Sequence, residues 1–227
     1  MTKIGYAISQ VLEKFLDEQG KRLKPATMRK YREVIELLKD CLNGYAYQSL
    51  DKEESGLYKR EDMKFCDVFG SEKILPGTGE FMGYFMVRKV IAGKEFLKYS
   101  GTVTKKLAKW LHAEGFVDER SAEFAVEAGS EASKVLPGAE ELSNMLYDIE
   151  EYISSDELIE EVFDHFSIMD VKPDGVVLSG LFDTRRFYVK LPHGVVDKWH
   201  DGWEASLQLG KTGDGWHIIS AGNVYPL

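Results

Sequence analysis

Apolar residues recur at the helical period over the first two thirds of the chain. In residues 6–19 they fall at positions 8, 11, 12, 15 and 16, and in residues 25–42 they step by three or four residues from Met28 to Leu42. This spacing places apolar side chains on one face of an α-helix. Pro25 suits the first turn of the second helix, where its missing N–H costs no hydrogen bond. The pattern predicts an antiparallel helical hairpin that packs on other helices.

An irregular stretch follows this hairpin. Residues 46–80 show no clear period and are interpreted as an insertion, with a short helix candidate at 61–69. Farther along the chain, Asp118 is a good N-cap residue, and Leu136-Pro137-Gly138 predicts a turn between two helices. The helices expected after the insertion span residues 80–98, with a break near Gly93, and then 102–114, 119–134 and 139–153.

The pattern changes after about residue 163, where apolar and polar residues alternate as in half-buried strands. Turn residues such as Pro173-Asp174-Gly175 separate the short strands. Strands of this length and spacing suggest a small barrel of the SH3-like or OB-like kind. The sequence therefore predicts an α+β protein. An α-helical domain over residues 1–160, with an irregular insertion at about 46–80, precedes a small C-terminal antiparallel β-barrel over residues 164–227.

Charge is unevenly distributed along the chain. The protein has 29 Lys and Arg against 38 Asp and Glu, a formal net charge of −9. Residues 1–110 contain 21 basic and 15 acidic residues, a net charge of +6, whereas residues 111–163 contain 2 and 15, a net charge of −13. A polyanionic partner is therefore compatible with the first half only. The acidic middle is expected to face solvent, to repel DNA, or to fold against the basic half as a mask.

The remaining composition indicates an ordinary cytoplasmic protein. No run of 18 apolar residues is present, so no membrane-spanning helix is expected. The N-terminal residues lack the apolar core of a secretory signal. Cys41 and Cys66 form neither a disulfide framework nor a metal-binding motif. Cys41 falls on the apolar face of a predicted helix and is expected to be a small buried hydrophobe in a reducing compartment.

Basic residues cluster in the loop between the first two helices and on the helix expected at 102–114. Lys and Arg at such positions contact phosphates, which fix a protein on DNA without reading its sequence. The alternative is a solvated helix surface, because Arg29 and Arg32 have Glu33 and Glu36 within i,i+4 reach. The candidate nucleic-acid-binding residues are Lys21, Arg22, Lys24, Arg29, Lys30, Lys105, Lys106 and Lys109.

These helical segments resemble the N-terminal, DNA-clamping (SAM-like) domain of phage integrases and other tyrosine recombinases. The matching features are a helix that ends in a short basic loop, the run Lys24-Pro-Ala-Thr-Met-Arg-Lys-Tyr31 that opens the next helix, and a later helix that closes with Trp110-Leu-x-x-x-Gly115-Phe116. The match covers about half the chain. It implies that basic residues of the matching helices touch duplex DNA.

The catalytic half of the recombinase family has no counterpart in this sequence. Recombinases cut DNA with a Tyr nucleophile, helped by Arg residues and a His-x-x-Arg pair. None of the five histidines is followed three residues later by Arg. The C-terminal part is also short and strand-like. The resemblance therefore implies a binding module without strand transfer, and we expect no enzymatic activity.

Motifs in the C-terminal part favour structure over chemistry. Gly210-Lys211-Thr212 resembles the end of a phosphate-binding loop, but the earlier glycine and the following helix are missing, so a hairpin is expected. His193 and His200 have only Asp197 or Asp201 to complete a metal site, which needs three or four converging ligands. No metal or cofactor is therefore expected. Four aromatic residues are expected to fill the barrel rather than to stack on bases or peptides: Trp199, Trp203, Trp216 and Tyr225.

The leading hypothesis from the sequence is a non-enzymatic, DNA-associated accessory or regulatory protein that binds the duplex backbone through its basic helices. The alternative is an intracellular protein–protein adaptor that uses the barrel and the acidic helices and binds no nucleic acid. Backbone binding predicts an affinity that falls steeply with salt, because phosphate contacts release counterions. An adaptor predicts a copurifying protein partner instead.

Overall fold

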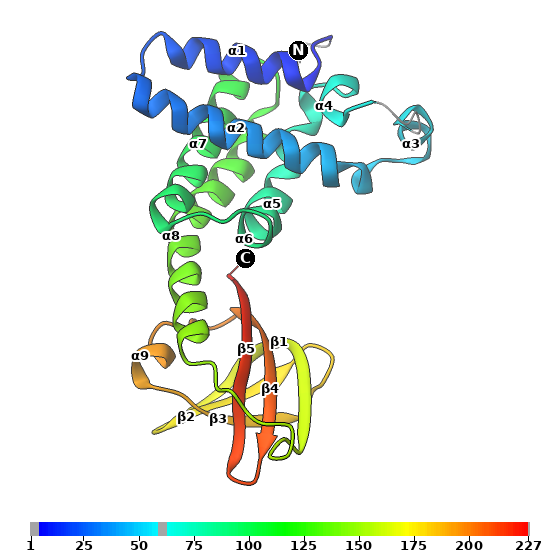
Figure 1. Cartoon of the computed structure of the whole chain (residues 1–227). Helices are drawn as coiled ribbons and strands as arrows, with labels where there is room; N and C mark the ends of the chain where they lie inside the picture. Colours follow the sequence, from blue (N-terminus) through cyan, green and yellow to red (C-terminus); the bar gives the residue numbers. More distant parts are fainter. Residues whose placement is uncertain (1–4, 59–62, 227) are drawn as a thin grey trace. The chain divides into compact units, whose positions relative to one another are not determined.

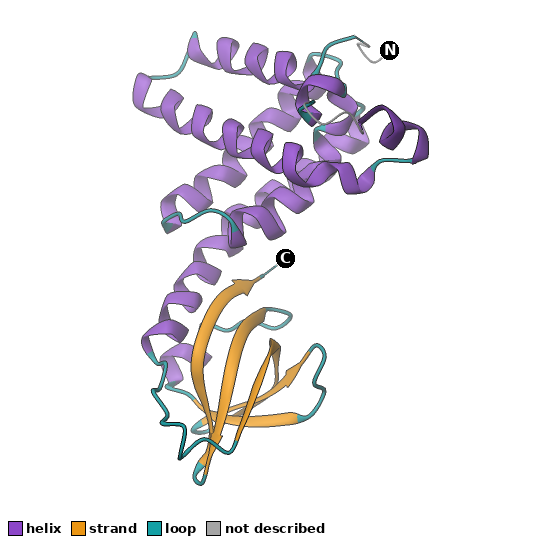
Figure 2. Cartoon of the chain, turned by 45° about the vertical axis from the view of Figure 1, so that its right-hand side comes forward, coloured by secondary structure: helices purple, strands orange, loops and turns teal. Residues whose placement is uncertain are grey.

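The computed structural model of the protein describes residues 5–58 and 63–226. The chain is α+β, with helices over its first part and strands after them (Figure 1, Figure 2). It divides into two compact units, Met1–Lys134 and Val135–Leu227, which we call the helical unit and the barrel unit. Among the described residues, no helix is long and apolar enough to cross a membrane.

The first two helices form the predicted hairpin. Helices α1 (Ile8–Gly20) and α2 (Pro25–Tyr45) lie side by side (Figure 1), and the Phe15 and Tyr31 rings stack with their centroids 6.0 Å apart. Helix α2 continues through Asn43-Gly44, where the sequence suggested an end. The side-chain oxygen of Asn43 instead accepts a hydrogen bond from the Cys66 backbone N–H (3.0 Å) and so ties α2 to the next segment.

Short helical turns occupy the region of the expected insertion. The start of the helix candidate at 61–69 lies outside the described residues, and one four-residue turn accounts for its second half. In chain order the elements are η1 (Ala46–Ser49), α3 (Lys52–Tyr58), α4 (Phe65–Val68), η2 (Ser71–Lys73), η3 (Leu75–Gly77), α5 (Thr78–Glu80), the π-turn η4 (Phe81–Phe85) and α6 (Met86–Arg88).

The core helix expected over residues 80–98 is divided. Its first part is the continuous run of α5, η4 and α6, in which Phe81, Met82 and Phe85 are buried. This run ends at Arg88, and Ile91 beyond it is fully exposed, whereas Leu97 is buried as part of the next helix. Gly93 has an extended backbone and is the N-cap of the next long helix.

Helices α7 (Lys94–Ala113) and α8 (Glu119–Asp148) cross at two glycines. A Cβ on Gly101 would lie 2.4 Å from the carbonyl oxygen of Gly129, and a Cβ on Gly129 would lie 2.8 Å from that of Gly101. The Ser133 hydroxyl donates a hydrogen bond to the Gly129 carbonyl (2.7 Å) beside this contact. The two backbones therefore touch, which only glycine permits at these positions.

Helix α8 begins as expected and ends later than expected. Its N-cap Asp118 accepts hydrogen bonds from the backbone N–H and the hydroxyl of Ser121 (2.9 and 2.7 Å). The turn expected at Leu136-Pro137-Gly138 is wrong, because α8 continues through Pro137 to Asp148. An internal proline costs a helix about 3 kcal/mol. The buried residues on either side of it, Leu136 and Ala139, keep the helix packed and offset this cost.

Five strands form one closed sheet with the order β1-β2-β3-β5-β4. All neighbouring strands are antiparallel except β3 and β5, which run parallel and meet at Val189 and Trp216. The closed sheet agrees with the prediction, but the expectation of a wholly antiparallel barrel is wrong. After β3 the chain crosses over and β4 pairs with β1, so the returning β5 has the same direction as β3. The elements are β1 (Glu160–Lys172), β2 (Gly175–Gly180), β3 (Arg186–Lys190), α9 (His193–Val196), β4 (Glu204–Thr212) and β5 (Gly215–Tyr225).

The core of the barrel unit includes part of α8. Ala139, Leu142 and Leu146 are buried together with strand residues such as Phe166 and Phe187. The two compact units consequently divide at Lys134–Val135, whereas the sequence placed the domain boundary between residues 160 and 164. The difference arises because the last turns of α8 present one apolar face to the sheet, which residue spacing within the helix does not reveal.

Replacing Gly101 by Ala should lower the free energy of unfolding of the helical unit by about 1–3 kcal/mol, because the added Cβ overlaps backbone atoms of α8. Circular dichroism during urea unfolding measures the change. Gly44→Ala is a matched control, since Gly44 lies in α2 with open space around its Cβ position. That change should raise stability by up to about 1 kcal/mol. Equal unfolding midpoints for the two variants would contradict the close crossing.

Candidate nucleic-acid interface

Two segments of the helical unit carry positive charge and no carboxylate. Residues 21–32, in the α1–α2 loop and the first turns of α2, contain six Lys or Arg, and residues 98–109 of α7 contain four Lys. All of these side chains are exposed except that of Lys105, which is half-buried. We call them the cationic surface: Lys21, Arg22, Lys24, Arg29, Lys30, Arg32, Lys98, Lys105, Lys106 and Lys109.

Aromatic contacts hold α7 against the α1–α2 hairpin and so bring the two segments together. The ring of Trp110 lies 5.4 Å from that of Phe15, centroid to centroid, and its indole N–H donates a hydrogen bond to the Glu18 carboxylate (2.7 Å). One end of α7 is thereby fixed to α1. Toward its other end, Tyr99 makes an edge contact with the ring of Tyr31 in α2 (6.1 Å).

A cation–π contact joins the two segments directly. The Lys30 ammonium lies 4.9 Å from the centroid of the Tyr99 ring. An α-helix turns about 100° per residue, so Lys106 lies on the same side of α7 as Tyr99 and Trp110. Both of these aromatic residues touch the hairpin. Lys106 therefore faces the side of α7 on which the basic α1–α2 loop lies.

The other lysines of α7 lie around the helix from Lys106. Lys98, Lys105 and Lys109 share the neighbouring side, because they are separated by seven and four residues. Lys105 borders α8, since its Cγ atom lies 3.0 Å from the Cβ position of Gly129. Of the eight residues predicted from the sequence, the Lys30–Tyr99 contact thus brings the segment with Lys21, Arg22, Lys24, Arg29 and Lys30 beside the helix that carries Lys105, Lys106 and Lys109. Lys105 and Lys109 lie at the α8 edge of the cationic surface, and Lys30 and Lys106 lie where α2 and α7 meet.

Positive charge on this surface is not neutralised by neighbouring carboxylates. Within the described part of the chain, none of its ten cations makes an ion pair. The expected i,i+4 pair between Arg32 and Glu36 is wrong, because Glu36 pairs with Lys39 (3.1 Å). Arg29 likewise makes no ion pair with Glu33. Arg22 donates a hydrogen bond to the side-chain oxygen of Gln19, which orients its guanidinium without cancelling its charge.

The sequence prediction missed three members of this site. Arg32 was assigned to an ion pair that does not form, and Lys98 lies before the start of the helix that the sequence indicated. Tyr99 was not singled out, although it carries the contact with Lys30. The spacing of Tyr99, Lys106 and Trp110 indicates that they share one face of a helix. That this face lies against the hairpin depends on tertiary packing, which the spacing does not indicate.

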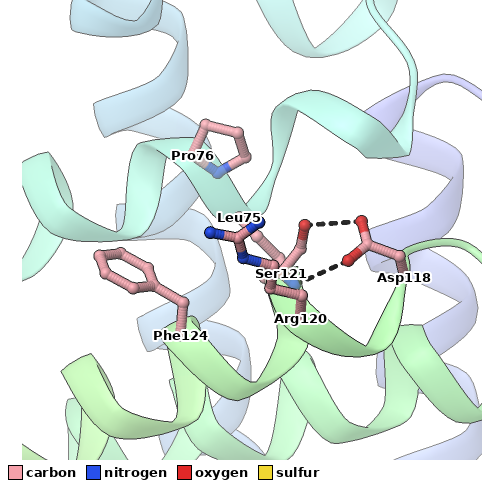
Figure 3. A pocket seen from close by; sticks show the side chains of 6 residues that line it. All are labelled: Leu75, Pro76, Asp118, Arg120, Ser121 and Phe124. Atoms are coloured by element: carbon pink, nitrogen blue, oxygen red, sulfur yellow. Dashed lines mark hydrogen bonds between the residues drawn. The ribbon is translucent and has the colours of Figure 1, made fainter.

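The largest cavity that we describe lies elsewhere in the helical unit and offers little chemistry. It is an open depression of about 530 Å³ between the start of α8 and the turn η3 (Figure 3). Arg120 and Phe124 project from α8 toward Leu75 and Pro76 (Figure 3). Its one carboxylate, Asp118, is used as the helix cap, and the hydrogen bonds from Ser121 lower the pKa of that carboxyl. The Ser121 hydroxyl and the Asp118 carboxylate, which both line the depression, are thus engaged with each other at the start of α8.

A second depression, of about 420 Å³, lies in the barrel unit beside His217. The Nδ1 atom of His217 is 2.9 Å from Glu151, and its Nε2 atom is 3.2 Å from Asp214. Burial alone would lower the pKa of His217, but these two carboxylates outweigh it and raise the pKa. Both ring nitrogens of His217 are therefore engaged by carboxylates in this structure.

The Gly210-Lys211-Thr212 motif and two of the four aromatic residues take the structural roles that the sequence favoured. Gly210-Lys211-Thr212 ends β4 and leads into the β4–β5 hairpin. Trp199 and Trp203 are buried in the barrel core, while Trp216 and Tyr225 are half-buried. His193 and His200 are exposed, and no group of three or more His, Cys, Asp or Glu among the described residues is arranged to hold a metal ion.

The chain matches no protein-family model, no curated protein and no solved structure. The resemblance to the recombinase clamp domain therefore stays a prediction from the sequence. The interface is defined by its own residues and their charges.

Both cysteine thiols should be unreactive in the native protein. Cys41 lines a depression of about 240 Å³, yet burial raises the pKa of Cys41 and of Cys66 to about 12. At pH 8 only about one thiol in ten thousand is then a thiolate, which is the reactive form. In a titration with a chromogenic disulfide at pH 8, the folded protein should release the coloured thiol slowly. In denaturant, two equivalents of the coloured thiol per protein should be released rapidly. Rapid labelling of the folded protein would contradict the burial of these thiols.

Proposed function

We propose that the protein is a non-enzymatic, DNA-associated accessory or regulatory protein and that the cationic surface binds the phosphate backbone of duplex DNA. The observation that carries the proposal is the meeting of two carboxylate-free basic segments at the Lys30–Tyr99 contact. Lys and Arg that neutralise phosphates supply most of the affinity of sequence-independent DNA binding. The ten cations, on packed helices and the loop between two of them, make no ion pair with the described residues, so they can contact phosphates without first breaking such pairs.

The distribution of charge supports a local rather than a global attraction. The helical unit has 23 Lys and Arg against 21 Asp and Glu, a net charge of +2, whereas the barrel unit has 6 against 17, a net charge of −11. Fields from charges more than about 10 Å apart are screened at ordinary salt concentration. The cationic surface can therefore attract a polyanion although the whole protein is acidic.

The chemistry of the surface favours double-stranded over single-stranded nucleic acid. Proteins that bind single strands stack bases on exposed aromatic side chains. The two aromatic residues of the basic segments are unsuited to this role, since Tyr31 is buried and Tyr99 is half-buried beside Lys30. What remains is an array of cations on helices, which suits the regular phosphates of a duplex.

Lys106→Glu combined with Lys109→Glu should weaken binding to a labelled duplex of about 30 base pairs by about tenfold or more. The slope of log affinity against log salt should also fall by about two, because two phosphate contacts are lost. Fluorescence anisotropy at several salt concentrations measures both effects. Both side chains are exposed, so the fold should be retained.

Lys52→Glu combined with Lys190→Glu is the matched control. It makes the same change of net charge, from −9 to −13, at exposed lysines of α3 and β3 outside the cationic surface. Duplex affinity should change by less than about threefold in this control. An equal loss of affinity in both double variants would show that net charge alone governs binding, and the proposed site would be wrong.

A single-stranded oligothymidine of the same length should bind more weakly than the duplex at each salt concentration. The single strand has a lower charge density, and the surface offers it no stacking platform. Competition of the unlabelled single strand against the labelled duplex gives the ratio of affinities directly. Preferential binding of the single strand would contradict duplex-backbone recognition, even if Lys106 and Lys109 were required for it.

A further inference from the structure

Three large apolar side chains stand exposed along one part of β1 in the barrel unit. Phe163, on β1, is 70% exposed, and Leu181 and Phe182, in the β2–β3 loop, are 58% and 84% exposed. Hydrogen bonds place this loop beside β1, since the Leu181 N–H donates to the His165 carbonyl (2.9 Å). We call these three residues the apolar surface of the barrel unit. Exposed apolar groups that gather in this way are typical of binding sites.

A buried carboxylate fixes the loop that carries Leu181 and Phe182. Asp164 is only 2% exposed, and its two oxygens accept hydrogen bonds from the backbone N–H groups of His165 (2.7 Å), Phe182 (2.9 Å) and Asp183 (2.7 Å). A buried carboxylate is costly unless its oxygens are satisfied in this manner. The loop therefore has a defined backbone, and the exposure of Phe182 is built into it.

Gly180 makes this arrangement possible. A Cβ at position 180 would lie 2.2 Å from the Oδ2 atom of Asp164 and 2.9 Å from the carbonyl oxygen of Asp183. The Gly180 N–H donates to that same carbonyl (3.0 Å), which closes the turn. Asp164 and Gly180 together determine the backbone of the loop on which the exposed Phe182 lies. A loop with a defined backbone loses less conformational entropy when a partner covers Phe182.

The charge around the apolar surface indicates the chemistry of the partner. Glu160, Glu161 and Asp183 border it, and Arg185 is already paired with Glu160 (2.8 Å) and Asp183 (2.6 Å). Two of the other five basic side chains of the barrel unit are also in ion pairs, Lys172 with Asp170 and Lys198 with Glu141. The unit as a whole has a net charge of −11. An acidic partner would therefore be repelled, and a basic one attracted.

We propose that Phe163, Leu181 and Phe182 dock a positively charged segment of a partner protein that carries aliphatic or aromatic side chains. The apolar side chains of that segment cover the three residues, and its Lys or Arg face the surrounding carboxylates. This docking site is separate from the cationic surface, because it lies in the other unit and attracts the opposite charge.

The test uses the full-length protein and labelled peptides of about a dozen residues. The first peptide combines Lys with Leu at helical spacing, the second replaces each Lys by Glu, and the third replaces each Leu by Ser. Fluorescence anisotropy should show binding of the Lys/Leu peptide, with each of the other two weaker by about tenfold or more. Phe163→Ser combined with Phe182→Ser should weaken binding of the Lys/Leu peptide by about tenfold as well.

Tyr152→Ser combined with Met169→Ser is the matched control, since these side chains are 96% and 55% exposed in the same unit. It should leave the affinity for the Lys/Leu peptide within about twofold. Circular dichroism verifies that both double variants are folded. Their binding to duplex DNA should be unchanged, so this proposal and the proposed function can fail independently.

Two results would overturn the proposal. Equal binding of the Lys/Leu and Lys/Ser peptides, or equal affinities in the two double variants, would mean that the acidic charge alone attracts the peptide. Sedimentation of the protein without peptide provides the second criterion. Concentration-dependent self-association that Phe163→Ser with Phe182→Ser abolishes would assign the apolar surface to a second copy of this chain, not to a basic partner.

Discussion

The packing of α7 against the α1–α2 hairpin is the contact on which the helical unit depends. Trp110 fills the space beside Phe15 and donates its indole N–H to Glu18, while Tyr99 reaches Tyr31. The same contacts use the nearby carboxylates, because Glu18 is engaged by Trp110 and Glu114 is paired with Lys14 (2.6 Å). Acidic groups are thus occupied at one end of the interface between α1 and α7. The basic residues toward the other end, from the α1–α2 loop to Tyr99, make no ion pair with any residue that the structure describes. The charge of the cationic surface follows from the packing as well as from the sequence.

Charged residues are distributed differently in the two units. In the barrel unit, carboxylates outnumber cations by 17 to 6, and three of the six cations (Lys172, Arg185 and Lys198) are in ion pairs, so the excess carboxylates determine the field. In the helical unit, acidic and basic residues are nearly equal in number, and the field depends on where they lie. This explains why a protein with a net charge of −9 carries a cationic surface. Net charge is informative about solubility and about non-specific attraction, but the positions of unpaired groups decide which surface can bind.

Local patterns in the sequence predicted what depends on local geometry. The periods of α1 and α2, the Asp118 cap and the alternating strands are each set by neighbours within a few residues. The failures involve contacts between distant residues. The turn at Pro137 was wrong because tertiary packing of Leu136 and Ala139 maintains the helix. The parallel β3–β5 pairing depends on the crossover between them, and the Arg32–Glu36 pair was displaced by Lys39. The loop held by Asp164 joins residues about 18 positions apart, and no spacing rule indicates it.

Phosphate contacts alone leave the proposed DNA association without sequence specificity, because they carry no information about the bases. A regulatory or accessory role then requires that something else determine where the protein acts. The apolar surface of the barrel unit offers a second point of attachment, with the opposite charge preference and in a separate compact unit. A protein held at one surface by a partner and at the other by a duplex gains from effective concentration, so neither contact needs to be strong. The weak, salt-dependent affinity expected of ten unpaired cations is compatible with function on this basis. Under the two proposals taken together, the partner bound at the apolar surface determines where the protein acts, and the cationic surface of the helical unit attaches it to DNA.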